Sequence, residues 1–141
     1  MKRHLKIDVI NRQCRLAISA AGIRKLATQV FKREAKNKLA GQVNICFVDD
    51  RCIKELNQRF LGKPVTTDVL AFENNMSACD IQADIIVSTQ TAVNNSVTFK
   101  TTPLYEMRLY VVHGILHILG FNDNNQRAKH LMRKTERKYV H

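Results

Sequence analysis

The distribution of hydrophobic and polar residues along this chain predicts four strands. The first segment alternates between apolar and polar side chains, as a strand with one buried face does. The second is a short apolar run between Gly41 and the aspartates Asp49 and Asp50, and a polar loop at residues 73–77 separates the last two. The expected strands cover residues 5–10, 43–48, 69–72 and 81–88.

Five other segments have the features of helices. Ser19 and either Asp49 or Asp50 are candidate N-caps, and Pro103 is placed to begin a long apolar helix. The sequence contains no repeat, low-complexity tract or linker, so we expect one α/β domain over residues 1–141. The expected helices cover residues 19–38, 51–60, 89–95 (followed by a loop at 96–102), the segment from Pro103 through the histidines, and about 124–140.

The long apolar helix carries the most specific chemical pattern of the chain, HGILHILGFND. His113 and His117 are four residues apart, so both imidazoles lie on one helix face and can reach one ion. Gly120 can end the helix in a left-handed conformation, which allows the chain to bring Asp123 toward the same ion. Three protein ligands leave a coordination position open, as in catalytic zinc sites.

The alternative is that these histidines only form hydrogen bonds inside a buried helix. An apolar helix has no packing reason to carry two imidazoles one turn apart, so the pattern favours a metal. Residue 114 is Gly, so the segment lacks the glutamate that acts as general base in HExxH metalloproteases. Proteolysis is therefore disfavoured.

Charge indicates the class of partner. The chain has 23 Lys and Arg against 12 Asp and Glu, a net charge of +11, and its pI is near 9.9. This excess favours a polyanion, most simply nucleic acid, although any single cluster could be ordinary solvated surface. No zinc-finger, RRM or KH signature narrows the choice.

The remaining composition predicts a cytoplasmic protein. The four cysteines show no CxxC pairing and are interpreted as free thiols in a reducing compartment. The basic N-terminus lacks the apolar core of a signal peptide, and no run of 18 apolar residues could span a membrane.

The histidine segment resembles the HGxLHLxGYDH signature of the YbeY-type bacterial endoribonucleases, the ribosomal RNA maturation factors. The match extends over about residues 45–137: Leu56-Asn57, Lys63 and the TDVLAF string at 67–72 are similar to the family's LN, GK and TDVLSF blocks. The resemblance implies an α+β fold, a small mixed four-stranded sheet packed with about five helices, and one Zn²⁺ at the end of the central apolar helix. It further implies single-strand-specific RNA cleavage in 16S 3′-end maturation and ribosome quality control, with the small ribosomal subunit as partner and no DNA specificity.

Two departures from the family pattern concern the site. Asp123 stands where the family has its third histidine ligand, and a carboxylate can still bind zinc. Alternatively, Asp123 caps the last helix, and Asn122 or water completes the metal site. Leu61 replaces an arginine that is expected to face the active-site cleft.

Further site roles follow from the resemblance and from position. Arg59 and Lys63 are candidates for holding RNA phosphates, with solvated surface as the alternative. Glu106, seven residues before His113, is a candidate catalytic residue, either as a proton acceptor or as a partner of a histidine. The alternative for Glu106 is a structural pair with a nearby Arg or Lys. For Asp68 and Asp84 we expect hydrogen bonds at strand ends.

Two classes of function therefore remain. The first is a zinc-dependent endoribonuclease with His113, His117 and Asp123 as ligands. The second is a non-enzymatic RNA-binding ribosome assembly factor, in which the basic surface binds RNA and a metal only supports folding. A metal-dependent hydrolase of another substrate has no support beyond the open metal site.

Overall fold

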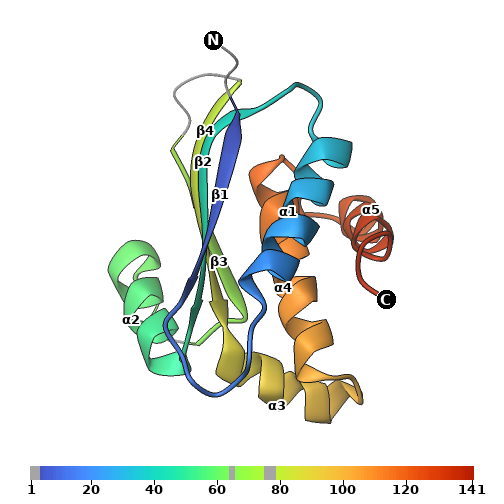
Figure 1. Cartoon of the computed structure of the whole chain (residues 1–141). Helices are drawn as coiled ribbons and strands as arrows, with labels where there is room; N and C mark the ends of the chain where they lie inside the picture. Colours follow the sequence, from blue (N-terminus) through green and yellow to red (C-terminus); the bar gives the residue numbers. More distant parts are fainter. Residues whose placement is uncertain (1–3, 64–65, 75–78) are drawn as a thin grey trace.

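The structure is a computed structural model that describes residues 4–63, 66–74 and 79–141, and within these ranges it contains four strands and five helices (Figure 1). The elements are β1 (Leu5–Asn11), α1 (Ala20–Glu34), β2 (Ala40–Val48), α2 (Asp50–Leu61), β3 (Val69–Glu73), β4 (Asp80–Ser88), α3 (Thr89–Phe99), α4 (Pro103–Ile118) and α5 (Gln126–Glu136).

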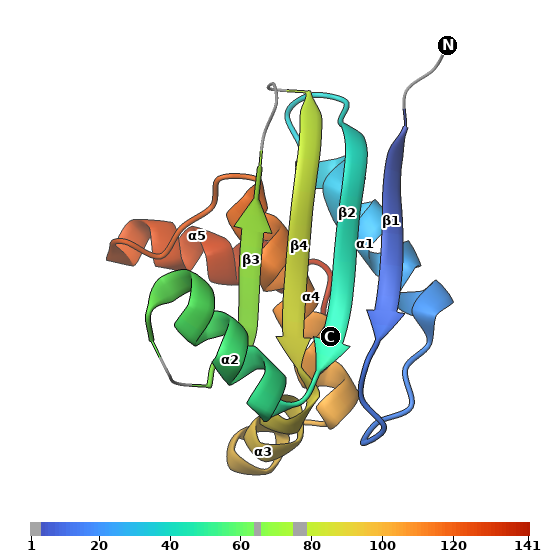
Figure 2. The ribbon, with the colours of Figure 1, turned by 90° about the vertical axis from the view of Figure 1, so that its left-hand side faces the viewer.

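The strands form one mixed sheet in the order β1-β2-β4-β3. β1 pairs with β2 and β2 with β4 in parallel, whereas β3 runs antiparallel to β4 along one edge. Helices α1 and α4 cover one face, with α5 packed against α4, and α2 covers part of the other (Figures 1 and 2). We call these the helical face and the α2 face. The mixed four-stranded α+β architecture predicted from the sequence is confirmed.

The main hydrophobic core lies on the helical face. Side chains on a strand alternate between the two faces, and one set from each of β1, β2 and β4 packs against the buried sides of α1 and α4. The largest fully buried side chains of this core include Phe47, Ile45, Ile85, Ile115 and Leu116.

The α2 face has a smaller apolar cluster, built around Val48, Ile53 and Leu70. Beyond α2, this face carries a row of hydrogen-bonded polar side chains across three strands. The Gln42 amide donates to Asp8 and to Asn44, and Asn44 donates to Asp84 over 3.0 Å. We call these four residues the polar ladder. Asp84 forms a hydrogen bond as predicted, but in the middle of β4 and not at a strand end.

The predicted caps agree with the structure, but the first helix is shorter than predicted. The side chains of Ser19 and Asp49 accept hydrogen bonds from the backbone of α1 and α2. Helix α1 ends at Glu34 instead of about Lys38, since Ala35 takes an extended conformation that leads the chain into β2. No Gly or Pro directly follows Glu34 to stop the helix, so the end of α1 depends on where β2 pairs with its neighbours.

Gly41 does not bound the second strand but lies inside it. Its φ is +122°, and a Cβ atom there would lie 2.1 Å from the carbonyl oxygen of Ile81 on β4. Only glycine allows this close approach of two strands. The strand therefore begins earlier than the apolar run suggested.

The third and fifth helices also differ from prediction. α3 continues through Phe99 rather than ending near Asn95, because its second half packs against α4 and buries Ser96. α5 ends at Glu136, and the chain then turns so that Tyr139 and Val140 are buried in the main core. The C-terminal ends of α3 and α5 thus depend on tertiary packing, which the local sequence pattern does not reveal.

Three other predictions concern the chain as a whole. The cysteines form no disulfide in the part that the structure describes. No helix among the described residues is long and apolar enough to cross a membrane. Part of the loop predicted at residues 73–77 lies outside the described residues.

Candidate active site

Helix α4 positions the two histidines, and its sequence explains where it lies. Thr102 caps it, Pro103 begins it, and Gly120 follows it with a φ of +100°. At Gly114, between the histidines, a Cβ atom would lie 2.9 Å from Ile85 Cγ2. The absence of a side chain at Gly114 thus lets α4 lie close to the sheet.

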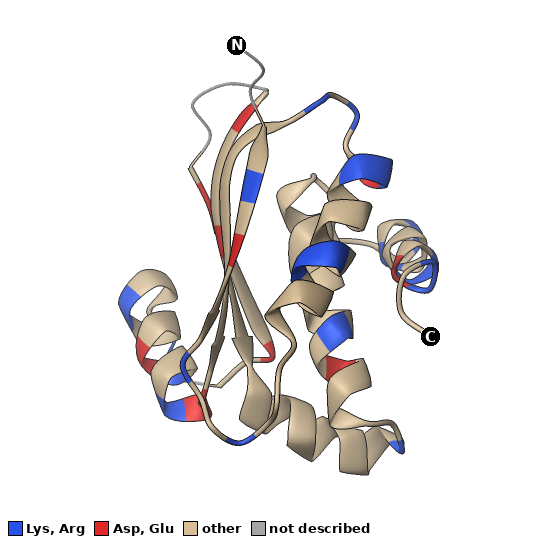
Figure 3. Ribbon diagram, viewed as in Figure 1, with Lys and Arg blue, Asp and Glu red and all other residues tan. Residues whose placement is uncertain are grey.

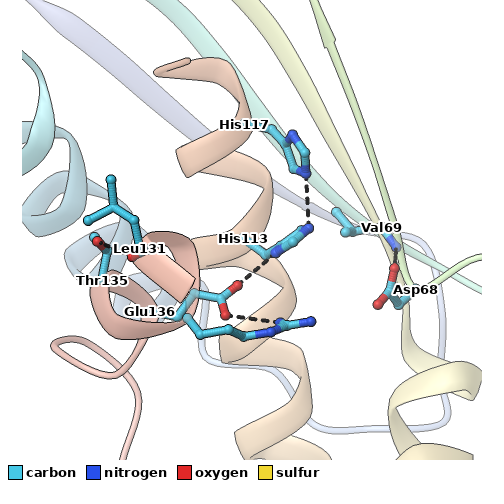
Figure 4. A network of polar contacts seen from close by, with 8 residues as sticks. Asp68, Val69, His113, His117, Leu131, Thr135 and Glu136 are labelled. Atoms are coloured by element: carbon cyan, nitrogen blue, oxygen red, sulfur yellow. Dashed lines mark hydrogen bonds and ion pairs between the residues drawn. The ribbon is translucent and has the colours of Figure 1, made fainter. Parts of the chain in front are cut away.

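The two imidazoles converge, as their spacing predicted. Nε2 of His113 and Nε2 of His117 are 3.0 Å apart, and the rings meet edge to face. His113 is mostly buried, whereas His117 is exposed to solvent. The pair therefore lies at the boundary between the core and the surface (Figure 4).

Glu136 holds His113 in place. Its Oε2 atom lies 2.7 Å from Nδ1 of His113, and its Oε1 accepts from Arg133 over 3.1 Å. The Glu136 side chain is 3 % exposed, so both contacts are largely shielded from water. With Nδ1–H of His113 donating to this carboxylate, Nε2 of His113 carries a lone pair directed at the space beside His117.

The sequence analysis missed Glu136. A signal was present, because Glu136 is the one acidic residue among the many basic ones between residues 124 and 141. The sequence alone could not show that Glu136 contacts His113, which lies 23 positions away on another helix. Only the packing of α5 against α4 brings the two together (Figure 4).

The pKa of His117 is lowered from its usual value. Partial burial of the ring disfavours the charged form most, and the neighbouring His113 acts in the same direction, while Asp123, Glu136 and Asp68 oppose the shift. At neutral pH His117 is therefore in the neutral form that a metal ligand requires.

A cleft of about 540 Å³ lies between the histidines and the edge of the sheet, a size typical of ligand-binding sites. Asp68 stands in its wall, at the start of β3, where its carboxylate accepts a hydrogen bond from the backbone of Val69 as predicted (Figure 4). The cleft is lined by Leu61, Thr67, Asp68, Val69, Leu70, Ala71, Phe72, Glu73, His113, Gly114, His117 and Ile118.

The structure does not bring Asp123 to the histidines as a ligand. Asp123 is exposed in the loop before α5, and the described residues contain no group of three or more His, Cys, Asp or Glu side chains able to hold a metal ion. It does not cap α5 either, because Asn125 does. The pKa of His117 is lowered overall, and the charge of Asp123 is one of those that oppose this lowering.

Glu106 lies elsewhere on α4. Its carboxylate is buried and accepts hydrogen bonds from Thr101 and Tyr110, which ties the start of α4 to the preceding loop. Seven residues of helix separate it from His113 by about 10 Å along the axis. The partner role predicted for Glu106 thus belongs to Glu136, and among the described residues Glu106 is bound by hydroxyl groups rather than by the Arg or Lys of the alternative prediction.

The two predicted phosphate-binding residues lie outside the cleft. Arg59 is exposed in the last turn of α2, and Lys63 is exposed just after it; neither lines the cleft formed by the described residues. Leu61, at the position expected to face the cleft, does line it. The cleft wall at Leu61 is therefore apolar, and no Lys or Arg is among the described residues that line the cleft.

Two side chains of the site, His113 and His117, have donor atoms suited to a zinc-like metal ion. Two nitrogen ligands of a tetrahedral zinc ion lie about 3.3 Å apart, close to the 3.0 Å between the two Nε2 atoms. The carboxylate on Nδ1 of His113 is the support that metal-bound histidines commonly have. Asp123 does not meet the two histidines as a third ligand would, but it is the candidate for the third ligand position of the metal.

Comparisons with known proteins agree on one family. A family model described as Endoribonuclease YbeY matches residues 8–141. A relative from Christiangramia forsetii named Endoribonuclease YbeY is 33% identical over 107 residues, covering 76% of this chain and 74% of the relative. One from Syntrophus aciditrophicus with the same name is 31% identical over 140 residues, 94% of this chain and 86% of its own. The solution structure of a Thermotoga maritima protein superposes with a TM-score of 0.64 at 28% identity, covering 96% of this chain and 87% of that one.

Proposed function

The chain belongs to the YbeY endoribonuclease family, and on that premise we propose that it is an endoribonuclease whose catalytic centre is the cleft beside His113 and His117. The observation that carries this proposal is the convergence of two Nε2 atoms at 3.0 Å, one of them held by a buried carboxylate. An apolar helix gains nothing in packing from such a pair, so its use is chemical.

We further propose a metal-assisted hydrolysis of single-stranded RNA. His113 and His117 would hold a zinc-class ion through Nε2, with Asp123 as the candidate third ligand. When bound, such an ion supplies a Lewis acid for a phosphoryl oxygen and makes a water molecule acidic enough to react near neutral pH.

The chain's own residues have separate tasks in this proposal. Glu136 keeps the proton of His113 on Nδ1, so that Nε2 stays available and the ring cannot rotate away. His117 contributes a neutral ring because its pKa is lowered. The edge of β3 and Leu61 form the opposite wall of the cleft, against which the unpaired strand would lie.

The biological setting of the activity follows from the family. We propose ribosomal RNA as the substrate, in 16S 3′-end maturation and ribosome quality control, and the cytoplasm as the location. The small ribosomal subunit is the corresponding partner. The alternative, an RNA-binding assembly factor without cleavage, is favoured by one observation, the exposed position of Asp123.

Cleavage of single-stranded ribosomal RNA by purified variants, with and without added zinc, tests the proposal. His117→Ala should lose more activity than the 10–100-fold typical of removing a ligand's supporting residue, and Glu136→Gln should lose an amount in that range. His4→Ala, which removes an exposed histidine at the start of the chain, is the matched control and should cut at the wild-type rate.

Equal cleavage by wild type and His117→Ala would place the chemistry outside this cleft and contradict the proposal. Absence of cleavage by the wild type with every metal tried, together with retained RNA binding, would support the assembly-factor alternative instead.

A further inference from the structure

Two segments on the helical side of the molecule carry a large share of its positive charge. They are α1 with the connection that follows it, and α5 with the chain end (Figure 3). All their Lys and Arg residues are exposed, and we call them together the basic helical surface: Arg24, Lys25, Lys32, Arg33, Lys36, Lys38, Arg127, Lys129, Arg133, Lys134, Arg137 and Lys138.

The two acidic residues within these segments are used internally. Glu34 accepts a hydrogen bond from Tyr139 and lies 3.8 Å from Lys138. Glu136 is buried against His113 and Arg133. Each of these carboxylates lies beside one cation of the surface, Lys138 or Arg133, and the described segments 20–38 and 124–141 contain no further Asp or Glu to offset the other cations.

The outer side of α1 also has a suitable shape. It lines a groove of about 730 Å³ that contains four cations and two polar side chains but no acid: Ala21, Arg24, Lys25, Thr28, Gln29, Lys32 and Arg33. Residues three, four and seven positions apart share one helix face, so the cations form a row along the groove. A row of cations beside amide and hydroxyl groups suits a chain of phosphates.

The opposite side of the molecule has the reverse character. Residues 40–88, which include β2, α2, β3 and β4, contain more acidic than basic residues. In Figure 3, red segments lie mainly on the strands, α2 carries both colours, and blue segments predominate on α1 and α5. A polyanion approaching this molecule is therefore steered toward its helical side.

The contacts already described connect this surface to the cleft. Glu136 joins α5 to His113 at the cleft, and Glu34 joins the end of α1 to Lys138, just after α5. These contacts place α5 beside the cleft and the end of α1 beside Lys138, so both basic segments are tied to the part of the molecule that holds the cleft. We propose that the basic helical surface binds the sugar-phosphate backbone of RNA that flanks the segment held in the cleft. This inference rests on the proposed function for the identity of the polyanion.

The test compares three double variants that each remove two positive charges. Lys25→Gln/Lys32→Gln changes the groove on α1, Lys129→Gln/Lys134→Gln changes α5, and Arg51→Gln/Lys54→Gln is the matched control on α2. Equilibrium binding of a ribosomal RNA fragment with a single-stranded segment flanked by duplex is measured over a range of salt concentrations, and thermal unfolding checks that each variant is folded.

Both surface variants should lower RNA affinity by on the order of tenfold and reduce the slope of log K against log salt by about 1.4. The α2 control should keep the wild-type slope. Equal losses in all three variants would mean that only net charge matters, and unchanged slopes in both surface variants would overturn the proposal. Tighter binding of the wild type to anionic phospholipid vesicles than to RNA, at the same salt, would overturn RNA as the partner.

Two further outcomes separate this proposal from the proposed function. If the wild type cuts no RNA but the surface variants still lose affinity and slope, the surface is supported and the catalytic proposal fails. If His117→Ala abolishes RNA binding, binding depends on the cleft, and the surface proposal is overturned.

Discussion

The helical face and the α2 face of the sheet differ in how much apolar surface they bury and in the polarity of their side chains. The helical face buries the main core and holds α4 with both histidines, and the basic helical surface lies outside it. The α2 face has a small cluster beside the polar ladder, whose residues are partly or fully exposed. The histidine pair is therefore mounted on the face that buries the main core, where buried neighbours hold α4 in position.

The largest loss of stability is expected when a buried side chain next to the histidines is shortened. Ile115 lies between them in sequence and is fully buried, so Ile115→Ala should lower the free energy of unfolding by about 2–5 kcal/mol. Leu56→Ala, in the partly exposed cluster of the α2 face, should cost less because its side chain loses fewer contacts. Urea denaturation measures both, and an equal or larger loss in the Leu56 variant would contradict the contrast between the faces.

A smaller loss of stability is expected when a side chain is added where α4 contacts the sheet. In Gly114→Ala, the new methyl group must displace Ile85 and Val69, at a cost of about 1–3 kcal/mol that exceeds the gain in helix propensity. RNA cleavage should fall as well, since the histidines move with α4. Thermal unfolding and cleavage rates are the measurements.

Gly22→Ala is the matched control for that substitution. Gly22 is also helical, but it is exposed on α1, and the nearest atom to an added Cβ is the end of the Ser19 side chain. This variant should be neutral or stabilised by up to about 1 kcal/mol. If both variants behaved alike, close packing at Gly114 would not position α4.

The smallest effect is expected on the polar ladder. Asn44→Ala removes the hydrogen bond to Asp84 on a face open to water, which should cost about 0.5–1.5 kcal/mol. Cleavage should stay at the wild-type rate, because nothing in the ladder lines the cleft. A large loss of activity in this variant would show that the α2 face takes part in function.

Much of the fold could be read from local patterns. Alternation along residues 5–10, the caps at Ser19 and Asp49, and Pro103 at the start of α4 each depend on neighbours within a few positions. For the same reason, the spacing of His113 and His117 was enough to predict that their rings converge. Metal binding at the pair remains a prediction.

Local sequence patterns were therefore sufficient to predict the order and type of the elements, the histidine pair and the excess of positive charge. Tertiary structure decided that Glu136, and not Glu106, supports His113, that Gly41 lies within β2, and that Asp123 stays apart from the pair. It also placed the cations of α1 and α5 on one side of the molecule. Local propensity acts over one or two turns of chain, whereas the partner of a side chain depends on which elements pack together, and that choice is made by the burial of apolar surface over the whole fold.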